Sequence, residues 1–125
     1  MIAGISTRAL AASAARAGYR VTAVDAFGDM DLRRTADVIL GRSQQPAQYE
    51  PLSAATAANR IPAGLTCYTS NFENYPAAVE RLARGRTLLG NPASVLKRVR
   101  DPLLLMNTLR QLGFSVPKTR SSAPS

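Results

Sequence analysis

Histidine and tryptophan are absent from the 125 residues, and Cys67 is the one cysteine. Without histidine the chain lacks the commonest general base and metal ligand, and with a single thiol a zinc site is excluded in practice. One cysteine forms no internal disulfide, which fits a reducing compartment and predicts a cytoplasmic location. Because Cys67 stands in an apolar stretch, we expect a buried, inert thiol rather than a nucleophile.

Long apolar runs and phosphate-binding signatures are also missing. No apolar run approaches the roughly 20 residues that span a bilayer, so we expect no membrane helix and no membrane partner. Arg8 and Arg16 interrupt the Ala-rich start and no basic region precedes it, so we do not expect a secretory signal there. Gly-Lys-Ser and Gly-Lys-Thr do not occur, which excludes a P-loop.

Acidic residues are scarce: 8 stand against 16 basic ones, for a net charge of +8. Such a balance is compatible with a nucleic-acid partner. However, the basic residues are nearly all arginines spread along helical patterns, without the aromatic-basic alternation that stacks bases. The simpler interpretation is a solvated basic surface on a single globular domain, with nucleic acid an unlikely partner.

Short apolar segments alternate with helical patterns along the chain. The expected strands are residues 1–5, 21–25, 38–40, 65–69 and 86–89. The expected helices are residues 7–17, 32–37, 52–60, 76–84, 93–99 and 103–112, with polar loops at 42–50 and 121–125. This alternation predicts an α/β fold, a Rossmann-like doubly wound parallel sheet of about five strands in the order 3-2-1-4-5.

Several residues mark the expected ends of the helices. Ser6 or Thr7 is expected to cap the first helix, and Gly18 to end it in a left-handed conformation. Asn91-Pro92 and Asp101-Pro102 each combine a capping side chain with a proline at the first helical position. The side of the first helix expected to face the sheet consists of Leu10, Ala14 and Ala17.

In a doubly wound sheet, ligands bind at the carboxyl ends of the strands, where the strand order reverses. The two loops at that point are residues 4–8 and 70–74. The first loop precedes a helix N-terminus and carries a cation, an arrangement that favours anions. We expect no catalytic residue in this chain, and the residues expected to bind substrate or anion are Gly4, Ser6, Thr7, Arg8, Ser70 and Glu73. Glu73 could equally meet an amine or hydroxyl of a ligand, or complement the dipole of the next helix.

Acidic residues after the second strand allow two further interpretations. Asp25 follows Gly4 by about twenty residues, as in a dinucleotide fold, but the loop has one glycine instead of three and we reject that interpretation. Asp25, Asp29 and Asp31 could hold a divalent cation. Local pairing with Arg33 and Arg34 is the simpler explanation, so no metal site is predicted.

A set of motifs resembles the domain that precedes the catalytic module of ATP-grasp ligases. The set begins with Gly-x-Ser-x-Arg-x-Leu-Ala from residue 4 and Val-Asp-x-Phe-Gly-Asp from residue 24. It continues as Asn-Phe-Glu-Asn, Leu-Leu-Gly-Asn-Pro, Arg-Asp-Pro and Leu-Gly-Phe-x-Val-Pro. The chain is most similar to an uncharacterised ATP-grasp group linked to tetrahydromethanopterin one-carbon metabolism. The resemblance implies a pre-ATP-grasp domain over residues 1–116, with 117–125 beginning a linker to an ATP-grasp domain that this chain lacks.

The resemblance implies the substrate-side domain of an enzyme that joins a carboxylate to an amine or thiol, using ATP and Mg²⁺. The family's ATP-holding and Mg²⁺-binding residues lie in the missing domains, so this chain would not catalyse ligation alone. Its implied partners are that missing domain and a small carboxylate or amine substrate. A homodimer is a further partner that we consider. Two positions depart from the family pattern: glycines do not flank Ser70, and Pro102 replaces a basic, nucleotide-contacting residue for which Arg100 is the candidate substitute. The alternatives are a stand-alone anion- or nucleic-acid-binding module, or a structural or dimerising domain.

Overall fold

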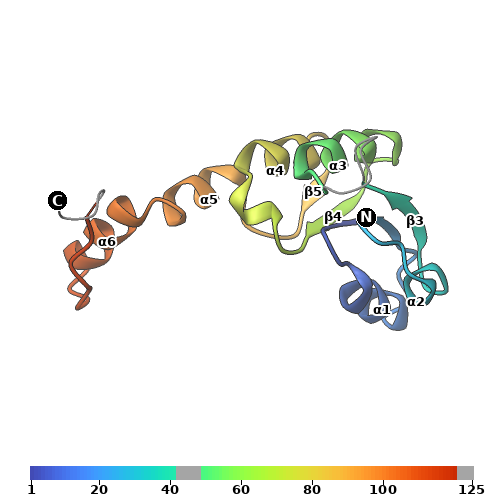
Figure 1. Ribbon diagram of the computed structural model, residues 1–125, viewed down its shortest axis with the longest axis horizontal. Helices are drawn as coiled ribbons and strands as arrows, with labels where there is room; N and C mark the ends of the chain where they lie inside the picture. The colour runs from blue at the N-terminus through green and yellow to red at the C-terminus, as the bar shows by residue number, and fades with distance from the viewer. Residues whose placement is uncertain (42–48, 121–125) are drawn as a thin grey trace.

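The computed structural model describes residues 1–41 and 49–120. The expected tail at 121–125 and most of the expected loop at 42–50 lie outside the described residues. The described part is an α/β structure built around one five-stranded parallel sheet (Figure 1). Among the described residues, no helix has the length and apolar character needed to cross a bilayer.

The sheet has the strand order that the sequence predicts. Its strands are β1 (Ile2–Ala3), β2 (Thr22–Asp25), β3 (Asp37–Leu40), β4 (Leu65–Tyr68) and β5 (Thr87–Leu88). They lie in the order β3-β2-β1-β4-β5, all parallel. In this register Ile2 pairs with Ala23 on one side and with Cys67 on the other. The strand order therefore reverses between β1 and β4, as predicted.

Helices flank the sheet unequally. They are α1 (Arg8–Arg16), α2 (Met30–Arg33), α3 (Pro51–Ala57), α4 (Pro76–Ala83), α5 (Ala93–Val99) and α6 (Pro102–Gln111), with 3₁₀ turns η1 (Ala58–Arg60) and η2 (Phe72–Asn74). α1 and α2 lie on one face of the sheet, whereas α3 and α4 lie on the other (Figure 1). α5 and α6 lead away from the sheet as a C-terminal arm, here residues 93–114 (Figure 1).

Local chemistry explains several helix ends. The Asp101 carboxylate accepts hydrogen bonds from the N–H groups of Leu103 and Leu104, which confirms the predicted cap of α6. The predicted Asn91 cap is wrong, because Pro92 holds the cap position of α5 and no side chain bonds to it. Gly18 has φ +86°, a left-handed conformation that suits glycine and ends α1 as expected.

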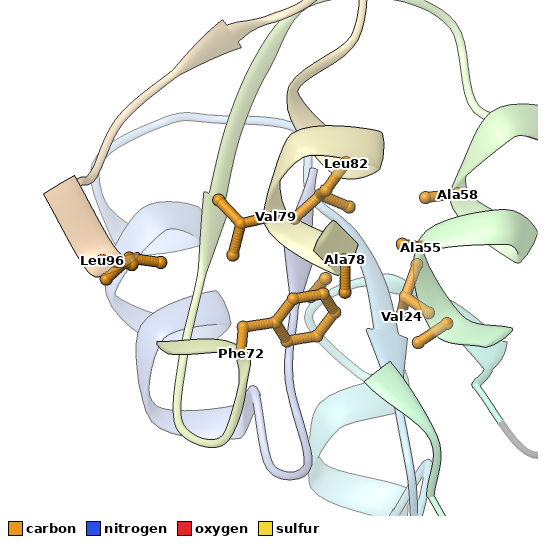
Figure 2. Close-up of a cluster of buried hydrophobic side chains, with 10 residues drawn as sticks. Val24, Ala55, Ala58, Phe72, Ala78, Val79, Leu82 and Leu96 are labelled. Atoms are coloured by element: carbon orange, nitrogen blue, oxygen red, sulfur yellow. The ribbon is translucent and has the colours of Figure 1, made fainter. Parts of the chain in front are cut away.

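The main core fills the face beneath α3 and α4. Phe72 lies at its centre, fully buried, with Val79 and Leu82 of α4 above it (Figure 2). The Tyr68 ring packs 6.2 Å from the Phe72 ring, centroid to centroid. Leu96 of α5 reaches the same core and is 3% exposed. The arm is therefore anchored on the α4 face of the sheet.

The face beneath α1 is packed by a smaller cluster. Ala11 is the buried residue of α1, and it packs with Ile2, Val21, Ala23 and Leu32. The predicted inward face of α1 is therefore wrong in part: Leu10 is 39% exposed and Ala17 is exposed, although Ala14 packs on the cluster. Because Ala11 is small, the helix approaches the sheet through it, about 100° around the helix from Leu10.

Candidate functional site

The loops after β1 and β4 lie side by side at the carboxyl edge of the sheet. The N–H of Ile5 donates to the carbonyl of Ser70 over 3.2 Å. The Thr69 hydroxyl donates to the carbonyl of Ser6 over 3.4 Å. These bonds bring Ser6 and Ser70, both exposed, to the same edge. The juxtaposition of loops that the strand order predicts is confirmed, whereas a binding role for these serines stays a prediction.

Gly4 is required by the contact between these two loops. A Cβ atom at position 4 would overlap the Thr69 hydroxyl and lie 3.1 Å from the Thr69 Cβ. Gly4 is also buried, and its N–H donates to the carbonyl of Val24 over 3.0 Å. Glycine at position 4 therefore allows the close approach of β1 and β4. Because Gly4 is buried, a ligand would contact the residues beside it rather than Gly4 itself.

Asp25 joins the β1 loop to the β2 loop from inside the protein. It is 2% exposed, and its Oδ2 accepts from the Thr7 N–H at 2.7 Å and the Thr7 hydroxyl at 2.8 Å. Its Oδ1 accepts from the N–H groups of Phe27 and Gly28, both at 2.8 Å. The α1 N-terminus therefore already has an internal carboxylate beside it, which is the anion that such a terminus favours.

The hydrogen bonds to Asp25 determine its ionisation. Burial alone would raise the pKa of this carboxyl, but hydrogen bonds from Gly28, Thr7 and Phe27 outweigh burial and hold the pKa below its ordinary value. Asp25 is therefore a charged structural hub. The sequence showed an acidic residue at this position but gave no sign that Thr7 would be its partner.

Thr7 differs from its neighbours in the predicted site. It is fully buried, and both its N–H and its hydroxyl donate hydrogen bonds to the Asp25 carboxylate. The expected capping bond from its side chain is absent, because Thr7 stands at the cap position of α1 with its hydroxyl turned to Asp25. Thr7 shapes the loop, whereas Ser6 and Arg8 are its exposed polar side chains.

Arg8 lies among the carboxylates of the β2–α2 loop. Its Nη1 is 3.8 Å from Asp29 Oδ2 and 3.8 Å from Asp31 Oδ2, with about half of the arginine side chain exposed. Asp31 also pairs with Arg34 over 3.4 Å, as the local-pairing interpretation predicts, whereas Arg33 donates to the carbonyl of Gly28 instead of pairing with a carboxylate. Asp29 caps α2 by accepting from the Leu32 N–H. Within residues 1–41 and 49–120, no three Asp, Glu, His or Cys residues are grouped to hold a metal ion.

Tyr68 connects the remaining carboxyl-edge loops and was not among the predicted residues. Its hydroxyl donates to the carbonyl of Asn91 over 2.7 Å, which ties the end of β4 to the loop before α5. Burial and the nearby charge of Glu73 raise the pKa of Tyr68, while the bond to Asn91 opposes them. Glu73 is half-buried in η2. A polar aromatic at the end of a strand was the one sequence signal that could have identified Tyr68.

Arg100 lies apart from these loops. It is exposed at the C-terminal end of α5, on the arm that leads away from the sheet (Figure 1). A hollow of about 680 Å³ also lies away from the loops, at the amino ends of the strands, where Leu10, Leu65 and Cys67 line it. Cys67 is half-buried there rather than buried as expected, and partial burial raises the pKa of its thiol.

The edge thus combines exposed serines, an arginine between two aspartates, and a half-buried glutamate on a pair of hydrogen-bonded loops. Such groups can orient a small polar molecule through hydrogen bonds and charge, and none of them is an activated nucleophile. Searches for a matching family model, a matching curated protein and a matching solved structure all returned nothing for this chain.

Proposed function

We propose that the chain is the N-terminal, substrate-side domain of an ATP-dependent carboxylate–amine or carboxylate–thiol ligase of the ATP-grasp superfamily. The observation that supports it most is the pairing of the 4–8 and 70–74 loops at the point where the strand order reverses. In open α/β sheets this is the position at which ligands bind. Two of the six motifs that resemble the family, Gly-x-Ser-x-Arg-x-Leu-Ala and Asn-Phe-Glu-Asn, fall on these two loops.

Four side chains would meet the substrate. Ser6, Arg8, Ser70 and Glu73 are exposed or half-buried at the edge, whereas Gly4 and Thr7 shape the loop from within. Arg8 would orient a substrate carboxylate, and Glu73 would attract an amine. The two serine hydroxyls can donate or accept, so they suit either substrate.

ATP and Mg²⁺ would be held by domains outside this chain, where they would activate the carboxylate as an acyl phosphate. The residues described here do not fit a triphosphate, because Asp25 already takes the Thr7 N–H and hydroxyl at the α1 N-terminus. Arg8 in turn lies 3.8 Å from Asp29 and from Asp31, whose charges repel a multiply charged triphosphate more strongly than a singly charged carboxylate. The proposed role of this chain is therefore to position substrate, and the chain alone would not ligate.

The test uses the complete gene product and measures ADP release with candidate amines and carboxylates. We expect Arg8→Ala to raise the KM for the carboxylate about 10- to 100-fold with little change in KM for ATP, because one charge-assisted hydrogen bond is lost. Glu73→Gln should raise the KM for the amine. Arg16→Ala, at the far end of the same helix, is the matched control and should leave both constants unchanged.

Two results would contradict the proposal. The first is a complete reading frame that encodes no ATP-grasp domain, with no partner chain that supplies one. The second is an active ligase whose substrate constants are the same in Arg8→Ala, Glu73→Gln and the wild type. That result would remove the carboxyl edge from the substrate site even though the family assignment stood.

A second candidate, binding of an anionic polymer, has one specific observation in its favour. Lys97, Arg98, Arg100 and Arg110 are all exposed on the arm, where Asp101 is the one acidic residue. If the arm binds RNA or DNA, the affinity for a labelled single strand should fall steeply between 50 and 200 mM salt. Arg98→Glu combined with Arg100→Glu should abolish that binding, and an absence of binding in 50 mM salt would dispose of this candidate.

A further inference from the structure

Within residues 1–41 and 49–120, two apolar surfaces are not covered by another element. The first is the open face, which we define as Leu10, Tyr19, Leu65, Cys67 and Leu89 around the hollow of about 680 Å³. It lies on the α1 side of the sheet. α3 and α4 cover the opposite side of β4 and β5, whereas α5 packs against α4 and leaves this side without a helix.

The second surface is the arm. α6 is ten residues long and contains no buried residue, although leucine, methionine and proline make up most of it. Its large exposed side chains, with the segment that follows it, are Leu103, Leu104, Leu112 and Phe114. α6 contacts α5 and otherwise leads away from the sheet (Figure 1). A helix this apolar is normally covered on at least one side.

The two surfaces match in size. A ten-residue helix is about 15 Å long, and four strand residues such as those of β4 span about 13 Å. The four large side chains of the open face are 39% to 59% exposed, and those of the arm are 39% to 67% exposed. Leu103 lies about 180° around α6 from Leu112, so the arm side chains that one partner surface can cover are Leu104, Leu112 and Phe114. At roughly 200 Å² for a large side chain, the open face presents about 400 Å² of apolar area and these three arm residues about 340 Å².

The arm does not cover the open face of its own chain. Leu96 anchors α5 in the core on the α4 side, beside Phe72 and Val79 (Figure 2). From that anchor α6 leads away from the sheet (Figure 1). A second copy of the chain is not held by this anchor.

We propose that the α6 arm of one copy docks on the open face of a second copy, and that the second copy does the same in return. When fully covered, two reciprocal contacts of this size would remove about 1,500 Å² from water, within the range of a standard stable interface. The arrangement is closed and two-fold symmetric, so it yields a dimer rather than a fibre. The inference does not depend on the ligase proposal, because it uses neither the carboxyl-edge loops nor a substrate.

The test measures the mass of the 125-residue chain in solution by light scattering after size-exclusion chromatography. We expect twice the 13.3 kDa chain mass at micromolar concentration. The face variant Leu65→Arg and the arm variant Leu112→Glu should each weaken the dimer more than about 100-fold, because each buries an unpaired charge. Leu52→Glu on α3, with 45% exposure against 47% for Leu65, lies outside both surfaces and should remain a dimer.

Mixing the two variants distinguishes the proposed exchange from other dimers. A mixed dimer keeps one native contact, between the arm of the face variant and the face of the arm variant, and its other contact pairs Arg with Glu. We therefore expect the mixture to regain dimer mass although neither variant does so alone. Circular dichroism checks that each variant is folded. If Leu65→Arg does not fold, the mass of Leu112→Glu alone tests the proposal, because Leu112 is 67% exposed and its substitution should leave the fold intact.

Three results would overturn the proposal. A wild-type chain that is monomeric at 100 µM would exclude the dimer. A dimer lost in the face variant but kept in the arm variant would indicate face-to-face contact. A mixture that stays monomeric, with both variants folded, would show that arm and face are not each other's partners.

Discussion

The two faces of one sheet are covered to different extents in this protein. On the α3–α4 face, Phe72, Val79 and Leu82 have no exposed surface, whereas on the α1 face Leu65 and Leu89 keep about half of theirs. The strands themselves are apolar on both sides, as two-sided burial requires. The difference therefore comes from the helices, since α5 joins the face that was already covered.

The largest effect should come from a pair of leucines on the two faces. Leu82→Ala empties part of the main core and should lower the free energy of unfolding by about 2–5 kcal/mol. In the monomer, Leu65→Ala removes a side chain that is 47% exposed and should cost less than about 1 kcal/mol, at protein concentrations too low for the proposed dimer. Urea denaturation of the two variants measures the contrast. Equal losses would show that the open face is covered in solution to the same extent as the packed one.

The next effect concerns Asp25, which holds the carboxyl-edge loops together between the two faces. Asp25→Asn replaces an acceptor of four hydrogen bonds by a group that donates in part, and should cost about 3 kcal/mol. Asp37→Asn, with 66% of its side chain exposed, is the control and should be nearly neutral. A small loss in Asp25→Asn would show that the loops do not depend on this hub.

The lowered pKa of Asp25 also gives its stabilisation a pH dependence. The folded-state pKa lies below the unfolded value of about 3.9, so the stabilisation is complete above that value and is lost as pH falls through the folded pKa. Wild-type unfolding free energy should therefore fall below about pH 4 more steeply than that of Asp25→Asn. Denaturation from pH 2.5 to pH 7 tests this, and parallel curves would contradict it.

A smaller effect separates the arm from the two faces. Asp101→Ala removes the cap of α6 and should cost that helix about 1 kcal/mol. The main contact of α6 is with α5. We therefore expect the amides of α6 to exchange faster in this variant, while the amides in the core of α4 keep their protection. Faster exchange in α4 would mean that the arm supports the packed face.

The smallest effect is expected at Arg8. Its ion pairs with Asp29 and Asp31 are long and exposed, so Arg8→Ala should change the free energy of unfolding by less than about 0.5 kcal/mol. Thermal denaturation measures the change. This near-neutrality makes the variant useful for kinetics, and a loss above 1 kcal/mol would indicate that Arg8 is part of the structure of the edge.

The sequence predicted the strand order and the position of α4 because both follow from regular alternation and spacing. It could not predict the side of α1 that is buried. Leu10 is the larger residue, but the position of the helix depends on the close approach of Ala11 to the sheet. Nor could spacing reveal that Thr7 would serve Asp25 eighteen residues away, since a short hydroxyl side chain fits a cap, a turn or a tertiary contact equally well.

The contact between Gly4 and Thr69 has a consequence for how relatives of this chain can vary. The Thr69 side chain occupies the space that a Cβ at position 4 would need. A relative with alanine at position 4 should therefore carry a smaller residue at position 69, and a relative with threonine at 69 should keep glycine at 4. Positions 4 and 69 are thus constrained to change together. Paired substitution at these two positions among relatives would reflect the contact between the β1 and β4 loops.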